Sequence, residues 1–164
     1  MKPATAWVAF GGNLGDVRAT VGQALAALDA LPGIRVIGRS RFYRTPAWGH
    51  TDQPDFINGV AALETTLAPR ALLDALLTTE LRFGRDRGAD APRWGPRTLD
   101  LDLLAVGDQV LDEPGLVLPH PRLHERAFVL VPLAELAPGF DVPGRGRVAD
   151  LLAAVDAAGI EAIP

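Results

Sequence analysis

The chain has 164 residues, about the length of one domain, and we expect residues 1–164 to form a single domain. Its 48% hydrophobic and 22% charged residues exclude a disordered or fibrous protein, and the absence of cysteine excludes disulfides, thiolate nucleophiles and Cys-ligated metals. A formal net charge of −4 differs from the basic footprint of most nucleic-acid binders, so we expect no nucleic-acid partner.

The first half of the chain predicts the order strand, helix, strand, strand. An apolar run from Ala4 to Phe10 predicts a strand that ends at the glycine-rich turn 11–15. This run is too short for a signal segment or a membrane span, so we expect no membrane contact and a cytoplasmic location. Apolar residues at helical spacing then predict a helix from Val17 to about Leu31. Further strands are expected at Ile34 to Tyr43 and at Phe56 to Glu64.

The second half predicts helix, strand and an irregular tail. The helix runs from Pro69 to Leu81, and a long aperiodic loop, Gly84 to Pro96, separates it from a strand at Arg97 to Val106. The order up to this point is that of an α+β, ferredoxin-like βαββαβ sandwich. A C-terminal extension follows, with a short strand and two helical segments: Gln109 to Leu111, Phe128 to Leu136 and Val148 to about Ala158.

Two aspartates mark the last strand of the sandwich. Asp100 and Asp102 stand two apart, so both carboxylates leave one face while the flanking leucines leave the other. Two hard oxygen ligands on a rigid strand suit Mg²⁺, and a cation would neutralise two like charges placed side by side. The other interpretation is a solvent-facing strand edge whose charges prevent aggregation. The pair alone leaves both interpretations open.

Arginines gather just before this pair. Lys2 is the lone lysine among 16 basic residues, and five of the arginines fall within residues 82–97. Guanidinium groups bind phosphate oxygens in bidentate fashion, so such a patch in an acidic protein indicates a small polyanion such as a nucleotide; the other interpretation is a solvated loop. Arginines beside divalent-cation ligands are typical of triphosphate chemistry.

The segment from Arg93 to Leu104, RWGPRTLDLDLL, resembles the signature of the 6-hydroxymethyl-7,8-dihydropterin pyrophosphokinase family of folate biosynthesis. The resemblance extends from about Trp7 to Leu136 and includes, in the family's order, the segments 11–15, 42–46, 52–58 and 119–120. It implies an enzyme that transfers the β,γ-diphosphate of ATP to the hydroxymethyl group of 6-hydroxymethyl-7,8-dihydropterin and releases AMP. We expect this enzyme to be a monomer.

The resemblance also implies three groups of site residues. Asp100 and Asp102 would hold two Mg²⁺ ions, with ATP as co-substrate, and Arg85 and Arg97 would act with them in catalysis. The residues expected to contact the pterin are Thr45, Pro46, Ala47, Trp48, Phe56, Asn58 and Phe128. The residues expected to contact ATP are Glu80, Arg85, Arg87, Arg93, Trp94, Arg97, Leu103, His120 and Arg126.

The residues themselves agree with part of this assignment. Phe56 and Asn58 share one strand face, which places an aromatic ring beside an amide that both donates and accepts, as a flat heterocycle with polar edges requires. Core packing is the commoner role of a phenylalanine taken alone. Glu80 continues an apolar helix stripe. Three positions stay open for its carboxylate: at the edge of the site, in solvent, or paired with a nearby arginine. His120 stands between prolines, and a lone histidine is more commonly structural.

Three positions depart from the family pattern. Leu77 stands where many members have glutamine, Gly88 where a basic residue is common, and Gly115 where some carry arginine. Fewer cations would reduce the phosphate neutralisation that the loop provides.

Two other functions stay open on the residues alone. A metal-dependent phosphodiesterase predicts hydrolysis without an acceptor, and a non-catalytic ferredoxin-like module predicts ligand binding without release of AMP.

Overall fold

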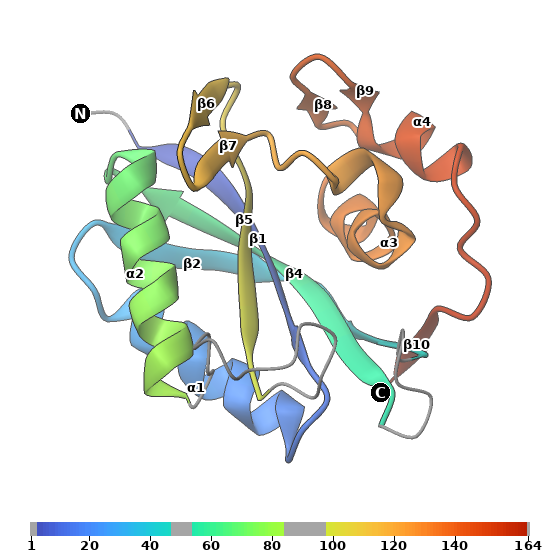
Figure 1. The fold of residues 1–164 in the computed structure, drawn as a ribbon, viewed down its shortest axis with the longest axis horizontal. Helices are drawn as coiled ribbons and strands as arrows, with labels where there is room; N and C mark the ends of the chain where they lie inside the picture. Colours follow the sequence, from blue (N-terminus) through green and yellow to red (C-terminus); the bar gives the residue numbers. More distant parts are fainter. Residues whose placement is uncertain (1–2, 47–53, 84–97, 164) are drawn as a thin grey trace.

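The computed structural model describes residues 3–46, 54–83 and 98–163. Its centre is an antiparallel sheet with helices on both faces (Figure 1). The strands pair in the order β10-β3-β4-β1-β5, and β2 also pairs with β4. Their bounds are β1 Ala4–Gly12, β2 Ile34–Arg39, β3 Phe42–Thr45, β4 Phe56–Thr65, β5 Asp100–Val106 and β10 Glu161–Ile163.

The helices divide between the two faces of the sheet (Figure 1). Two helices, α1 (Val17–Asp29) and α2 (Pro69–Arg82), cover one face. The other face is covered in part by α3 (Ala127–Leu136), which packs with α4 (Val148–Ala153). Short elements complete the described fold: the hairpin of β6 (Leu111–Glu113) and β7 (Leu116–Leu118), the 3-10 turn η1 (Leu123–Glu125), and the hairpin of β8 (Asp141–Val142) and β9 (Gly146–Arg147).

Local sequence explains where the two long helices begin. Asp16 caps α1, because its side chain accepts a hydrogen bond of 3.1 Å from the N–H of Ala19. In α2, Pro69 occupies the first turn, where its missing N–H costs no helical hydrogen bond. Both helices bury the apolar stripes that the spacing predicts, with Leu28 and Leu72 fully buried.

Alternation along the strands divides the core in two. In β4, Ala61 and Leu63 pack against α1 and α2, whereas Val60 packs against α3, which confirms the predicted faces of this strand. In β5, Leu101 and Leu103 face α1 and α2. Asp100 and Asp102 therefore lie on the face of the sheet that α3 covers only in part, where they are half-buried.

The predicted strand from Ile34 to Tyr43 is wrong as a single element, because it bends at Ser40. The N–H of Ser40 donates to Val60 O at 2.8 Å, and the Ser40 hydroxyl accepts from the N–H of Val60 at 3.0 Å. Ser40 therefore binds both the C=O and the N–H of Val60, and the strand is divided into β2 and β3 at this point. The hydrophobic pattern of the sequence does not indicate this division.

The tail also differs from its prediction. A strand begins at Leu111, whereas Gln109 to Leu111 was expected, and α4 ends at Ala153 where a helix to about Ala158 was expected. The chain then crosses back to the sheet, where β10 pairs with β3. The sequence pattern does not indicate β10.

The α+β class is confirmed, while the ferredoxin-like arrangement with a helical extension and the single domain stay predictions. Within the three described ranges, no helix is long and apolar enough to cross a membrane.

Candidate active site

Two rows of side chains cross the face of the sheet that α1 and α2 leave uncovered. Strand register aligns Asp100 of β5 with Gly11 of β1, Asn58 of β4 and Tyr43 of β3. A second row, two residues along, contains Asp102, Ala9 and Val60. Directly paired residues point to the same face, and strands lie about 4.8 Å apart, so the carboxylate side and the amide side of the first row are about 10 Å apart.

Asn58 is held at the centre of this face by its neighbours. Its Nδ2 donates a hydrogen bond of 3.0 Å to Oγ1 of Thr45, which is buried. Its Oδ1 lies over Gly11, where a side chain would overlap it. A glycine in a strand interior marks such close approaches. The amide therefore has a fixed orientation before any ligand arrives.

Behind the aspartates, Glu80 supports the edge strand β5. Glu80 is 0% exposed, and its Oε2 accepts a hydrogen bond of 2.6 Å from the N–H of Leu101. Since β5 ends the sheet on this side, its outward N–H groups lack a strand partner among the described residues. The carboxylate satisfies the amide that lies between Asp100 and Asp102 in sequence, and so fixes the backbone that carries both.

A loop after β7 brings His120 to the same area. The His120 N–H donates to Leu104 O of β5 at 2.8 Å, two residues from Asp102, and the peptide bond between Leu118 and Pro119 is cis. Burial lowers the pKa of His120 below its ordinary 6.5, and the charges of Arg126 and Arg122 lower it further, while Asp102 acts in the opposite direction. The ring is therefore neutral at pH 7. Its Nδ1 accepts from the Arg122 N–H at 3.1 Å, so its proton lies on Nε2.

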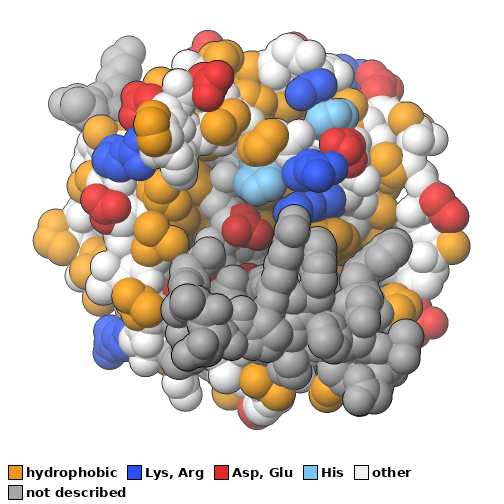
Figure 2. Space-filling model, in the orientation of Figure 1, with side chains coloured by type: hydrophobic (Ala, Val, Ile, Leu, Met, Phe, Trp, Pro, Cys, Tyr) orange, Lys and Arg blue, Asp and Glu red, His pale blue; other side chains and the backbone are white. Residues whose placement is uncertain are grey.

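The start of α3 supplies a cation and a ring. Arg126 precedes the helix, and its guanidinium carbon lies 5.6 Å from the ring centroid of Phe128. Phe128 is half-buried and packs on the apolar cluster that includes Val60 and Leu104, on the face that carries the aspartates. Figure 2 shows histidine, basic and acidic side chains gathered near the centre of the molecule's face, beside the grey residues.

The structure brings together the predicted residues of five segments: Thr45 and Pro46, Phe56 and Asn58, Asp100 and Asp102, His120, and Arg126 with Phe128. Seven predicted site residues lie outside the described residues, as does the predicted loop Gly84 to Pro96: Ala47, Trp48, Arg85, Arg87, Arg93, Trp94 and Arg97.

Two residues predicted to contact ATP, Leu103 and Glu80, have buried side chains. Leu103 is 5% exposed and packs in the cluster beneath α1 and α2, because it alternates with the aspartates along β5. Its side chain therefore points to the opposite face of the sheet from Asp100 and Asp102. Glu80 is 0% exposed, which is inconsistent with the solvent-facing position, and its Oε2 accepts from the backbone N–H of Leu101 in β5.

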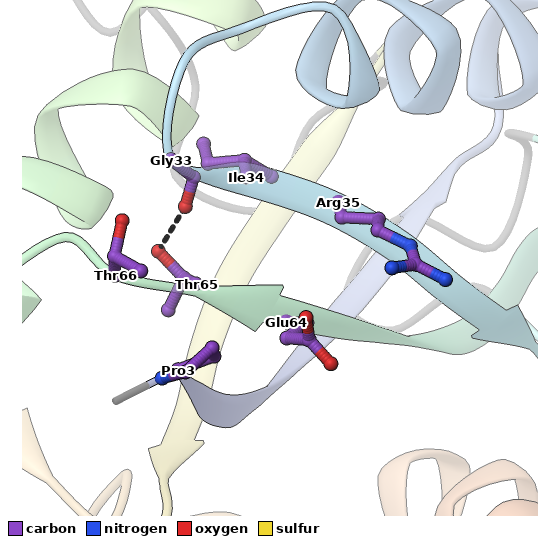
Figure 3. A pocket seen from close by; sticks show the side chains of 7 residues that line it. All are labelled: Pro3, Gly33, Ile34, Arg35, Glu64, Thr65 and Thr66. Atoms are coloured by element: carbon purple, nitrogen blue, oxygen red, sulfur yellow. Dashed lines mark hydrogen bonds between the residues drawn. The ribbon is translucent and has the colours of Figure 1, made fainter. Parts of the chain in front are cut away.

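Two pockets of the described structure lie away from the two rows of residues that contain Asn58 and Asp102. A shallow pocket of about 210 Å³ forms where Thr65 ends β4 (Figure 3). There the Thr65 hydroxyl donates to Gly33 O at 2.7 Å, and Arg35 and Glu64 lie beside it. Thr65 is nine residues from Phe56, or about 30 Å along the strand. A second pocket, of about 320 Å³, lies between α1 and α2 on the opposite face.

Comparisons with known proteins bear on this geometry. The family model for 7,8-dihydro-6-hydroxymethylpterin-pyrophosphokinase matches residues 7–138. The chain belongs to this family. A protein of Pseudomonas aeruginosa named 2-amino-4-hydroxy-6-hydroxymethyldihydropteridine pyrophosphokinase is 49% identical over 96% of this chain and 96% of its own length. A Methylorubrum extorquens protein of the same name is also 49% identical, over 96% of this chain and 98% of its own.

Solved structures agree on the fold of this pyrophosphokinase family member. A chain described as HPPK-DHPS in complex with substrates matches with a TM-score of 0.68 at 11% identity. A Plasmodium falciparum HPPK-DHPS triple mutant matches with a TM-score of 0.71 at 13% identity. These matches include 92% and 93% of the present chain but only 43% and 44% of the longer HPPK-DHPS chains. The family expected from the sequence is thus confirmed, and neither alternative function receives support.

Within this family member, sequence reasoning missed some residues that shape the site. Gly11 appears in the sequence only as part of a turn, yet it is the place where Asn58 lies against β1. Asn13 is buried, and its Nδ2 donates to Pro54 O at 2.9 Å, which joins the turn after β1 to the approach to β4. Both residues belong to the GGNLG segment, which the sequence marks as a turn. The residues that they contact, Asn58 and Pro54, lie more than 40 positions later in the chain.

Proposed function

We propose that this pyrophosphokinase transfers the β,γ-diphosphate of ATP to the hydroxymethyl oxygen of 6-hydroxymethyl-7,8-dihydropterin, as a step of folate biosynthesis. Family membership supports the activity. The observation that supports the site is the shared row of Asp100, Gly11 and Asn58, which sets metal-type ligands and a ring-recognising amide about 10 Å apart on one rigid face.

The pterin end of the site is assigned to β3, β4 and α3. The family resemblance assigns Phe56 and Phe128 to the two faces of the pterin ring, and both residues belong to the side of the sheet that carries the aspartates. Asn58 and Thr45 recognise its polar edge, with Pro46 beside them. Asn58 is suited to this, since its amide is already oriented and a preorganised partner loses little entropy on binding. Ala47 and Trp48 are proposed to complete the contacts from the family resemblance alone.

The nucleotide end is assigned to the residues around β5. His120 offers a neutral Nε2–H, and Arg126 a guanidinium, to phosphate oxygens. Arg85, Arg87, Arg93, Trp94 and Arg97 are proposed as further nucleotide contacts from the family resemblance alone. We do not assign ATP contact to the side chains of Leu103 or Glu80, because both are enclosed in the core.

The donor set of Asp100 and Asp102 fits Mg²⁺. Both are half-buried carboxylates on one face of a rigid strand, and hard oxygen ligands suit this ion. No third acidic or histidine ligand gathers with them in the described part of the chain, so the remaining ligands would be phosphate oxygens and water. We propose two ions, which would supply neutralisation of charge on the triphosphate.

The chain's residues position the two substrates for in-line transfer. The hydroxymethyl oxygen forms a bond to the β-phosphorus, the bond from that phosphorus to the oxygen bridging to the α-phosphate breaks, and AMP leaves with that oxygen. The hydroxyl proton passes to solvent, since no described side chain at this face is a strong base. Most of the rate enhancement then comes from positioning and charge stabilisation.

Nucleotide chromatography tests this function directly. The purified chain is mixed with ATP, Mg²⁺ and 6-hydroxymethyl-7,8-dihydropterin, with a second reaction that lacks the pterin. AMP that forms only with the pterin is the expected result. ADP would indicate single-phosphoryl transfer, and AMP without the pterin would indicate hydrolysis, so either contradicts the proposal.

A monomeric state and a cytoplasmic location stay predictions, to be checked by light scattering and cell fractionation.

A further inference from the structure

A polar cluster joins α3 to the sheet beside the candidate site. The Tyr43 hydroxyl of β3 donates a short hydrogen bond to Oε1 of Glu135 near the end of α3. Arg41 binds the same carboxylate, with its N–H 3.0 Å from Oε2 and its Nε 3.2 Å from Oε1. Tyr43 is 4% exposed, whereas Arg41 and Glu135 reach the surface. The buried hydroxyl is the inner contact of the three.

The sheet end of this contact is rigid and next to the amide that we assign to the pterin. Tyr43 pairs with Asn58 on one side and with Ala162 of β10 on the other. Paired residues point to the same face, so the phenol ring stands beside the Asn58 side chain. Two residues along β3, Thr45 accepts the hydrogen bond from Asn58.

The helix end of the contact is in line with the stacking ring. Phe128 and Glu135 are seven residues apart in α3, close to two full turns, so they share one face of the helix. The rise between them is about 10 Å. A bond that fixes Glu135 against β3 therefore fixes the height and rotation of the helix face that presents Phe128.

We propose that Tyr43 and Glu135 form a positioning pair that sets the separation between Phe128 and Asn58 and thereby the affinity for a flat heterocycle. The proposal rests on the proposed function of this site. The apolar cluster that includes Leu130 and Leu133 already holds α3 on the sheet. Apolar contacts are not directional, so the hydrogen bond supplies the alignment that packing alone does not.

The test measures pterin affinity separately from nucleotide affinity. Tyr43→Phe keeps the ring and removes the hydroxyl. Titration of the holoenzyme with 6-hydroxymethyl-7,8-dihydropterin, in the presence of Mg²⁺ and a non-hydrolysable ATP analogue, is expected to give a Kd raised about 3- to 10-fold. The affinity for the analogue itself and kcat at saturating pterin are expected within two-fold of wild type.

A conservative variant separates positioning from simple stabilisation. Glu135→Gln keeps the length and the acceptor oxygen, so it is expected to retain pterin affinity within two-fold, while Glu135→Ala is expected to match Tyr43→Phe. Glu113→Gln is the matched control, since the Arg70–Glu113 ion pair joins α2 to the β6–β7 hairpin away from the site. A Tyr43→Phe variant that loses melting temperature but keeps wild-type pterin affinity would overturn the proposal.

The failure of this inference is distinguishable from failure of the proposed function. If the wild-type chain does not bind the pterin, the proposed function is wrong. If the wild type binds and all four variants bind equally well, the function stands and the positioning role is wrong. A fall in nucleotide affinity equal to the fall in pterin affinity would also overturn the proposal, because the pair would then act on the whole fold.

Discussion

The amide oxygen of Asn58 lies in the space that a β-carbon at Gly11, on the neighbouring strand, would occupy. A β-carbon at Gly11 would overlap that oxygen and would stand 2.8 Å from the carbonyl oxygen of Ile57, closer than such contacts occur. The glycine is therefore required by the position of Asn58 and not by a turn. It also separates Asn58 from Asp100 in the row across the sheet.

Gly11→Ala is expected to weaken pterin binding by about 10-fold or more, since Asn58 must leave its orientation. Calorimetric titration with the pterin in the presence of an ATP analogue measures this. Gly22→Ala in α1 is the matched control, because a β-carbon there meets open space. That control is expected to stabilise the helix by about 0.5–1 kcal/mol without changing affinity. Equal pterin affinity of the two variants would contradict the role of Gly11.

Asp102→Asn is expected to reduce AMP formation by about 100-fold or more, because the neutral amide no longer attracts a divalent cation. Thermal unfolding without metal is expected to stay the same or rise, since one of two adjacent like charges is removed. Asp112→Asn, on the exposed strand β6, serves as the control. A variant at residue 102 with wild-type kcat in Mg²⁺ would refute the assignment of the ligands.

Phe128→Ala is expected to weaken pterin binding by about 1 kcal/mol or more through lost stacking. The control is Phe140→Ala, which removes a ring that contacts Trp7 at 5.7 Å between centroids in the same apolar cluster. We expect the control to lower the free energy of unfolding while the pterin Kd stays within two-fold. If both variants change affinity alike, the stacking assignment is wrong.

Glu80→Ala is expected to destabilise the fold by about 1–3 kcal/mol, because the N–H of Leu101 loses its partner in the buried core. Glu80→Gln retains an acceptor oxygen and is expected to lose less. Urea unfolding compares the two, and AMP formation shows whether the shift in β5 reaches the aspartates. Wild-type stability of Glu80→Ala would mean that this amide finds another acceptor.

Glu135 gives the fold a pH dependence with a definite sign. Burial raises the pKa of Glu135, but the hydrogen bonds from Tyr43 and Arg41 outweigh it and hold the pKa below its ordinary 4.5. The unfolded state therefore binds protons first as pH falls, so this stabilisation is present above 4.5 and is lost as pH falls through the folded-state pKa. Urea unfolding at a series of pH values should show wild type and Glu135→Gln converging only in acid.

The sequence pattern predicted the features that depend on alternation and periodicity. The faces of β4, the buried stripes of α1 and α2, and the placement of Asp100 and Asp102 opposite Leu101 all follow from spacing along one segment. The family resemblance added residues from segments far apart, such as Phe56 and Phe128, that spacing alone could not bring together.

The features that escaped prediction depend on contacts between distant segments. Ser40 divides a predicted strand only because its hydroxyl meets Val60 on another strand. Leu103 was carried over with its signature, although its parity in β5 directs it into the core. The partner of Glu80 and the pairing of β10 with β3 involve residues with no shared local pattern.

The opposite directions of Asp100 and Leu101 also bear on how the protein tolerates change. From Asp100 to Leu103, the residues of β5 alternate between the substrate face and the apolar core, whereas Leu104 to Val106 are all buried. A saturation scan of positions 100 to 103 should therefore alternate between variants that accumulate but do not turn over and variants that fail to accumulate. Substitutions on the substrate face can be explored with little loss of foldability, so the chemistry of this sheet can diverge among relatives while its core remains in place.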